Sequence, residues 1–127
     1  MNLVSGNATG NKLGAKARSI ASSRNTVGSC YAAVADAIDA TVARFLSGSS
    51  AYMAADQLKN SGYFNEVSVS DLRSLPAGAV VVWGKTSASP HGHISIALGN
   101  GQEASDHIAS QLTSLRGYSN YRVFMPK

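Results

Sequence analysis

The chain has a single cysteine, Cys30, and it lies in the sequence Gly28-Ser29-Cys30-Tyr31. The apolar spacing that follows predicts a helix beginning at this residue. Unpaired backbone N–H groups and the helix dipole stabilise a thiolate at the start of a helix, so Cys30 is a candidate nucleophile. The alternative is a small buried apolar side chain, because free cysteines are often interior. Position alone does not separate the two.

A histidine with a specific setting offers the matching base. His93 opens a segment in which small side chains share its face of a strand, while the opposite face carries Ile94, Ile96 and Leu98. If the helix of Cys30 packs against the small face, the imidazole can take the thiol proton and form a thiolate–imidazolium pair. A structural histidine is the alternative. The two residues together favour a cysteine hydrolase.

A third polar group would have to orient the imidazole ring. The dipeptide Asn100-Gly101 predicts a hairpin after the strand of His93. The returning segment carries four polar candidates within a few residues: Gln102, Glu103, Ser105 and Asp106. The residues alone leave the choice among them open.

These residues belong to a chain of 127 residues with a formal charge of +4. That length suits one domain with one core, so we expect a single domain over residues 1–127, with residues 1–10 frayed. One cysteine excludes an intramolecular disulfide, and a metal site would depend on three histidines and the carboxylates. We expect no metal and no cofactor.

The elements that must position these residues follow from periodicity. Apolar residues at helical spacing predict three helices, at residues 11–23, 30–46 and 50–60. Alternating or continuous apolar runs after residue 66 predict strands at 67–70, 79–83, 93–98, 102–106 and 121–125. Helices first and a meandering antiparallel sheet second indicate an α+β fold.

The order of three motifs resembles the CHAP and NlpC-like cysteine peptidases and amidases. The motifs are Gly-Ser-Cys-Tyr at a helix start, Leu-Pro-Ala-Gly-Ala-Val-Val-Val-Trp at 75–83, and Gly-His-Ile-Ser-Ile-Ala-Leu-Gly-Asn-Gly at 92–101. The match covers residues 27–108. Members of this superfamily cut amide bonds in bacterial peptidoglycan on a reduced papain-like fold, which the resemblance implies here.

The resemblance makes Cys30 the nucleophile and His93 the general base. His91 is a competitor because it shares strand parity with His93, but it follows Pro90 in an expected loop. The family pattern of Gly-His followed by alternating aliphatic residues falls on Gly92 and His93.

The resemblance gives two positions for the third residue. The CHAP pattern selects Asp106, whereas the NlpC-like spacing lands on Ser105, whose hydroxyl would orient imidazole weakly. We select Asp106, with Glu103 as the alternative. Residues 103 and 106 have opposite strand parity, so we expect only one of them to face the site.

Two further assignments concern substrate contacts. The family's oxyanion stabilisation falls on Ser29 and on the backbone N–H of Cys30. Trp83 could line a substrate groove, although a tryptophan that ends a buried strand is more often a core residue.

The resemblance therefore implies a peptidoglycan amidase or endopeptidase that acts on stem peptides or cross-links. Two alternatives stay open: a papain-like hydrolase or deamidase that acts on a protein, and a non-catalytic wall-binding module. We expect no nucleic-acid partner, because the 11 basic residues are scattered and not interleaved with exposed aromatic residues.

No apolar run approaches the length of a membrane helix, and the first ten residues lack the pattern of a secretory signal. We therefore expect a protein that is made in the cytoplasm and is not inserted in membranes. We also expect a monomer. It would reach the wall of a target cell through a secretion system such as type VI, or the host wall at lysis. An injected toxin would also need a cognate immunity protein that blocks its cleft.

Overall fold

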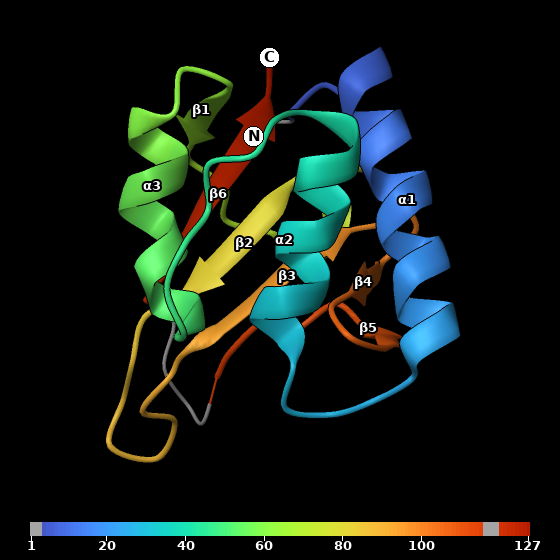
Figure 1. Ribbon diagram of the computed structural model, residues 1–127. Coiled ribbons are helices and arrows are strands. Elements are labelled where there is room, and N and C mark those ends of the chain that lie inside the picture. The colour runs from blue at the N-terminus through green and yellow to red at the C-terminus, as the bar shows by residue number, and fades with distance from the viewer. Residues whose placement is uncertain (1–3, 116–119) are drawn as a thin grey trace.

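The computed structural model describes residues 4–115 and 120–127. Figure 1 shows the α-helices lying across a twisted sheet. The α-helices are α1 (Ala8–Arg24), α2 (Cys30–Thr41) and α3 (Ala54–Asn60), and two short 3-10 helices are η1 (Ala51–Met53) and η2 (Leu72–Ser74). The strands are β1 (Phe64–Val67), β2 (Val80–Trp83), β3 (His93–Ala97), β4 (Gln102–Ala104), β5 (Ile108–Ser110) and β6 (Tyr121–Pro126).

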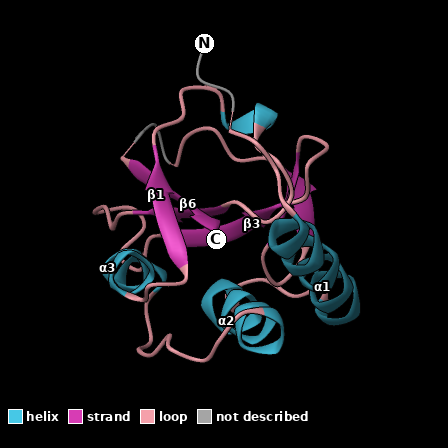
Figure 2. Ribbon diagram, turned by 90° about the horizontal axis from the view of Figure 1, so that it is seen from above, coloured by secondary structure: helices cyan, strands magenta, loops and turns pink. Residues whose placement is uncertain are grey.

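The sheet has six strands in the order β1-β6-β2-β3-β4-β5, and neighbouring strands are antiparallel. The C-terminal strand β6 therefore lies between β1 and β2. All three α-helices cover the same face of the sheet (Figure 2). The α+β prediction is confirmed.

Helix α1 begins earlier than residue 11. The side chain of Asn7 accepts a hydrogen bond of 2.7 Å from the N–H of Gly10, and this N-cap starts the helix at Ala8. The expected fraying of residues 1–10 is therefore wrong for residues 8–10, whereas residues 1–3 lie outside the described part of the chain. Gly10 packs so closely that a Cβ atom there would lie 2.6 Å from the carbonyl oxygen of Ala77.

Helix α2 ends at Thr41, five residues before the predicted end. Val42, Phe45 and Leu46 continue the apolar pattern of the helix, but they lie after its end and pack against the core from a loop. Phe45 stacks on Tyr63 with ring centroids 5.9 Å apart and meets Phe64 at 6.0 Å. Burial of an apolar residue does not require a helix, so the periodicity continued past the point where the helix ended.

The strand boundaries also differ from the prediction. Strand β1 begins at Phe64 because its ladder with β6 pairs Phe64 with Pro126 and Val67 with Val123. Strand β4 ends at Ala104, two residues early, and the short strand β5 was not predicted. The other predicted strands agree with β2, β3 and β6 within one residue.

Each face of the sheet carries its own core cluster. On the helical face, Ile94 and Ile96 of β3 pack in one cluster with Val34 and Ile38 of α2. On the opposite face, Ala97 belongs to a cluster with Trp83 and the loop residues Leu72 and Leu75. The expectation that α2 packs against the small face of β3 is therefore wrong. Large aliphatic side chains offer α2 more apolar surface to bury.

Candidate active site

The first residue of α2 and the first residue of β3 meet at one end of the two layers. Cys30 is half-buried and lines one cleft with His93, and its thiol lies close enough to the His93 side chain and to the backbone N–H of Ile94 for both to influence its ionisation. His93 therefore does not need to share a sheet face with α2. Its position at the start of the strand lets the imidazole reach the helix N-terminus.

The surroundings shift the pKa values of both groups toward an ion pair. Burial raises the pKa of the Cys30 thiol, but the hydrogen bonds from His93 and Ile94 and the charge of His93 outweigh it, so the pKa lies below its ordinary value. Burial has the opposite effect on His93 and lowers its pKa, but the interactions with Cys30 and Glu103 are stronger and raise this pKa to about 9. This arrangement favours thiolate and imidazolium at neutral pH.

The partner of the His93 ring is Glu103. The distance between His93 Nε2 and Glu103 Oε2 is 2.8 Å, and the carboxylate is almost fully buried. The other carboxylate oxygen accepts hydrogen bonds from Gln111 Nε2 at 3.0 Å and from the N–H of Leu112 at 2.8 Å. These bonds fix the carboxylate and leave Nδ1 of His93 for the thiol.

Asp106, which the resemblance selected to orient His93, has other partners. Its Oδ2 accepts hydrogen bonds from the N–H of Ser29 at 2.8 Å and from Thr26 Oγ1 at 3.1 Å. Its Oδ1 lies 3.0 Å from His107 Nδ1. Asp106 therefore joins the loop before α2 to the segment after β4, and the expectation that it holds the His93 ring is not met.

Residues 103 and 106 do not follow the predicted strand parity, because β4 ends at Ala104. Past that residue the alternation of side chains no longer applies, and both Glu103 and Asp106 approach the Cys30 region from different directions. Burial raises the pKa of Asp106, but the hydrogen bonds from Ser29 and His107 lower it by more, so the carboxyl is ionised. Ser105 donates to Asp106 Oδ1 at 3.3 Å and is bound within this loop.

Two predicted substrate contacts change with the structure. The backbone N–H of Ser29 already binds Asp106, so it is not free to stabilise an oxyanion. The N–H of Cys30, at the first position of α2, remains the candidate donor. Trp83 has no solvent exposure and packs in the cluster opposite the helices, so it does not line a groove.

An open cleft of about 510 Å³ gives access to the thiol. Its walls include Cys30, His91, Gly92, His93, Asp106 and His107. His91, the competing base, lies 2.6 Å from Ser50 Oγ through its Nδ1 and belongs to the cleft wall. Ser50 was not predicted as a site residue, since nothing in its local sequence marks it.

Neither a metal site nor a membrane span is found in the described residues. Within residues 4–115 and 120–127, no three His, Cys, Asp or Glu side chains group closely enough to bind a metal ion. Over the same ranges, no helix combines the length and the apolar character needed to cross a bilayer.

The fold and this geometry define a class: a small α+β domain with a cysteine–histidine–carboxylate site at the start of a helix. No protein-family model matches the chain, and no curated protein matches it in sequence. Solved structures with the same fold are crystal structures of the type VI effector–immunity complex Tae3–Tai3 from Ralstonia pickettii.

The similarity extends over most of both chains. A chain of the native complex has a TM-score of 0.64 and 24% identity, covering 90% of this chain and 98% of its own. A chain of the SeMet complex has a TM-score of 0.62 and 26% identity, covering 85% and 97%. The arrangement of three helices on a six-stranded antiparallel sheet is thus shared with a chain of a type VI effector–immunity complex.

Proposed function

We propose that this chain is a cysteine amidase or endopeptidase that cleaves amide bonds in the stem peptides or cross-links of peptidoglycan. The observation that carries the proposal is the array of Cys30, His93 and Glu103. A half-buried thiol with a lowered pKa, an imidazole next to it and a buried carboxylate behind the imidazole are the parts that nucleophilic acyl transfer needs.

The proposed reaction uses Cys30 as the nucleophile and His93 as the acid and base. The Cys30 thiolate attacks the amide carbon, and the backbone N–H of Cys30 stabilises the oxyanion that forms. The His93 imidazolium gives its proton to the leaving amine, which breaks the C–N bond and leaves a thioester on Cys30. His93 then takes a proton from water, the hydroxide attacks the thioester, and the thiolate is released.

Glu103 keeps the ring of His93 in place through these steps. Because its carboxylate accepts from Nε2, the second ring nitrogen faces the thiol and carries the proton that moves. The negative charge of Glu103 also stabilises the imidazolium. In this mechanism the proton transfers involve residues of the chain and water only.

Similarity to a chain of the Tae3–Tai3 complex supports a role as an antibacterial type VI effector. We propose that the protein acts on the wall of a target cell after delivery, and that a cognate immunity protein protects the producing cell. An immunity protein that occupies the cleft would block substrate from reaching Cys30.

The deciding experiment is digestion of purified sacculi followed by mass spectrometry of the released fragments. The native chain should release muropeptides whose masses identify the cleaved amide bond, and Cys30→Ala should release none while its circular dichroism spectrum stays unchanged. A Ser22→Ala variant on the exposed side of α1 serves as a control. Equal release by Cys30→Ala would contradict the proposal.

Thiol alkylation distinguishes the proposed enzyme from a non-catalytic wall-binding module. With a lowered pKa, Cys30 should react with iodoacetamide well below pH 8.5, the approximate value for a free cysteine. An inert thiol together with undiminished binding to sacculi would favour the module.

A further inference from the structure

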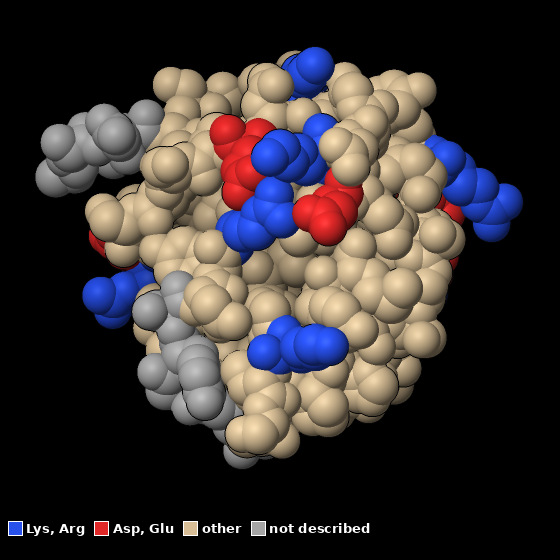
Figure 3. All heavy atoms as spheres, turned by 90° about the vertical axis from the view of Figure 1, so that its left-hand side faces the viewer, with Lys and Arg blue, Asp and Glu red and all other residues tan. Residues whose placement is uncertain are grey.

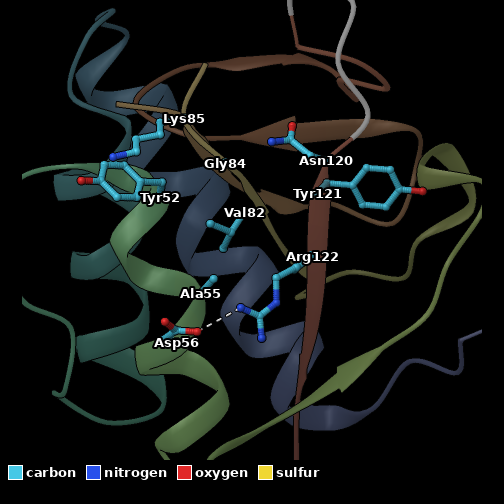
Figure 4. Close-up of a pocket in the computed structure, with 9 residues that line it drawn as sticks. All are labelled: Tyr52, Ala55, Asp56, Val82, Gly84, Lys85, Asn120, Tyr121 and Arg122. Atoms are coloured by element: carbon cyan, nitrogen blue, oxygen red, sulfur yellow. Dashed lines mark hydrogen bonds and ion pairs between the residues drawn. The ribbon is translucent and has the colours of Figure 1, made fainter. Parts of the chain in front are cut away.

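A second hollow lies beside the catalytic cleft, between α3 and the adjacent ends of β2 and β6. Its volume is about 460 Å³, and its polar walls come from Tyr52, Asp56, Gly84, Lys85, Asn120 and Arg122 (Figure 4). Figure 3, which faces this side of the molecule, shows basic and acidic side chains gathered around a depression in the surface. The catalytic steps proposed above do not use this hollow.

A narrow ridge separates the hollow from the cleft. Ala51 lines the cleft, and the next residue, Tyr52, lines the hollow. The other side of the ridge is Gly92, where a Cβ atom would lie 3.1 Å from Tyr52 Cβ and 3.3 Å from the carbonyl carbon of Gly84. An extended peptide bound at Cys30 could therefore continue into the hollow after crossing one layer of residues.

The two cations of the hollow differ in their partners. Arg122 is held by Glu66, with its Nε and Nη2 at 2.8 and 2.9 Å from the carboxylate oxygens, and by Asp56 at 3.1 Å. The single charge of Arg122 is therefore shared by two carboxylates of the protein. Lys85 Nζ instead lies 5.1 Å from the centre of the Tyr52 ring.

Lys85 forms no ion pair with an acidic side chain of residues 4–115 and 120–127. A contact with an aromatic face restrains the ammonium group but leaves N–H donors for a ligand. Lys85 thus offers the hollow an ammonium group that no carboxylate of the described residues contacts directly, while Asp56 in the same wall is bound to Arg122.

Asn120 adds a polar group next to this cation. The N–H of Gly84 donates to the carbonyl of Asn120 at 3.2 Å, and a Cβ atom at residue 84 would lie only 2.7 Å from Asn120 Nδ2. Glycine at position 84 thus allows the amide of Asn120 to lie against the backbone that precedes Lys85. An ammonium and a carboxamide at one site suit a carboxylate ligand.

We propose that this hollow is a subsite that binds a carboxylate group of the substrate peptide through Lys85 and Asn120. The inference rests on the proposed function, because the peptide bound there is the one cleaved at Cys30. It makes Lys85 a determinant of substrate choice. Stem peptides whose free carboxylate reaches the hollow when the cleaved bond lies at Cys30 are preferred over amidated ones.

The test measures binding without turnover. In a Cys30→Ala background, calorimetry compares a muropeptide that has free carboxylates with the same muropeptide after amidation. The free form should bind about two- to fivefold more tightly, the range expected for a partly exposed ion pair. Lys85→Met should remove this preference, and Lys85→Arg should retain most of it.

The matched control is Lys59→Met, which removes one exposed lysine near the end of α3 and does not line the hollow. It should leave the preference intact. If Lys85→Met and Lys59→Met weaken binding equally, the effect is general electrostatic attraction and the subsite is disproved. Equal affinity of the Cys30→Ala chain with Lys85 unchanged for free and amidated muropeptides would also disprove the subsite.

The outcomes keep this inference apart from the proposed function. Sacculi digestion by the chain with native Cys30 tests the amidase activity alone. If sacculi are cleaved and Lys85→Met shows unchanged KM values for free and amidated muropeptides, the subsite is wrong and the enzyme assignment stands. If sacculi are not cleaved and no muropeptide binds, both fail.

Discussion

His93 Nε2 lies 2.8 Å from Glu103 Oε2, and this contact places a buried carboxylate directly behind the imidazole that lies next to Cys30. The carboxylate is itself held by Gln111 and by the N–H of Leu112. The site therefore depends on a chain of contacts that starts beyond β5 and ends at the N-terminus of α2.

Replacing Glu103 with Gln should lower kcat by roughly 10²- to 10⁴-fold, because the ring of His93 would lose its orientation and the imidazolium its stabilising charge. Steady-state kinetics on soluble muropeptides would measure the loss. Glu66→Gln, which removes an exposed carboxylate bound to Arg122, serves as the control and should keep its kcat. A kcat for Glu103→Gln within about twofold of the native value would rule out this role for Glu103.

The pKa of His93 predicts a pH dependence. Because this pKa is raised from 6.5 to about 9, the imidazolium stabilises the folded state fully below pH 6.5, and that contribution is lost as the pH rises through 9. NMR of the ring protons should show titration near pH 9 in the native chain. In Glu103→Gln and Cys30→Ser the pKa should move toward its ordinary value, and an unchanged pKa in both would contradict the contacts described.

Asp106 is expected to position the nucleophile rather than the base. Asp106→Ala would leave the Ser29 N–H and Thr26 Oγ1 without their acceptor, and should cost about 1–3 kcal/mol in the free energy of unfolding. Urea denaturation measures that cost. The pH at which half of Cys30 reacts with iodoacetamide should shift as the helix start moves, while the pKa of His93 should depend less on this variant than on Glu103→Gln.

Ionisation of Asp106 also gives a prediction at low pH. Its pKa is lowered from 3.8, so the carboxylate stabilises the fold above that value, and the contribution is lost as the pH falls through the lower folded-state pKa. Acid denaturation of Asp106→Asn should therefore depend less steeply on pH in this window than that of the native chain. Identical acid transitions would show that Asp106 does not contribute.

Trp83 should act as a core residue. Trp83→Ala should lower the free energy of unfolding by about 3–5 kcal/mol, because it leaves a cavity in the face of the sheet opposite the helices. Trp83→Phe keeps most of the buried volume and should fold with a KM close to that of the native chain. A large rise in KM for a stably folded Trp83→Phe would instead indicate a substrate contact.

The sequence determined those parts of the site that local patterns control. A helix starting at Cys30 follows from the apolar spacing of residues 31–38, and a strand starting at His93 follows from the alternation of residues 93–98. The α+β order of elements could be predicted for the same reason. These features need only neighbours in the chain to be recognised.

Tertiary structure decided the face on which α2 packs and the partner of each carboxylate. Strand β4 ends at Ala104, so the parity of residues 102–106 did not predict where Asp106 lies. Glu103 reaches His93 across the sheet, and Asp106 turns back to the N–H of Ser29, a residue 77 positions away in sequence. A hydrogen bond forms only where the donor and the acceptor come close in space. The strand ends and loop paths that bring these groups together depend on the packing of the whole chain.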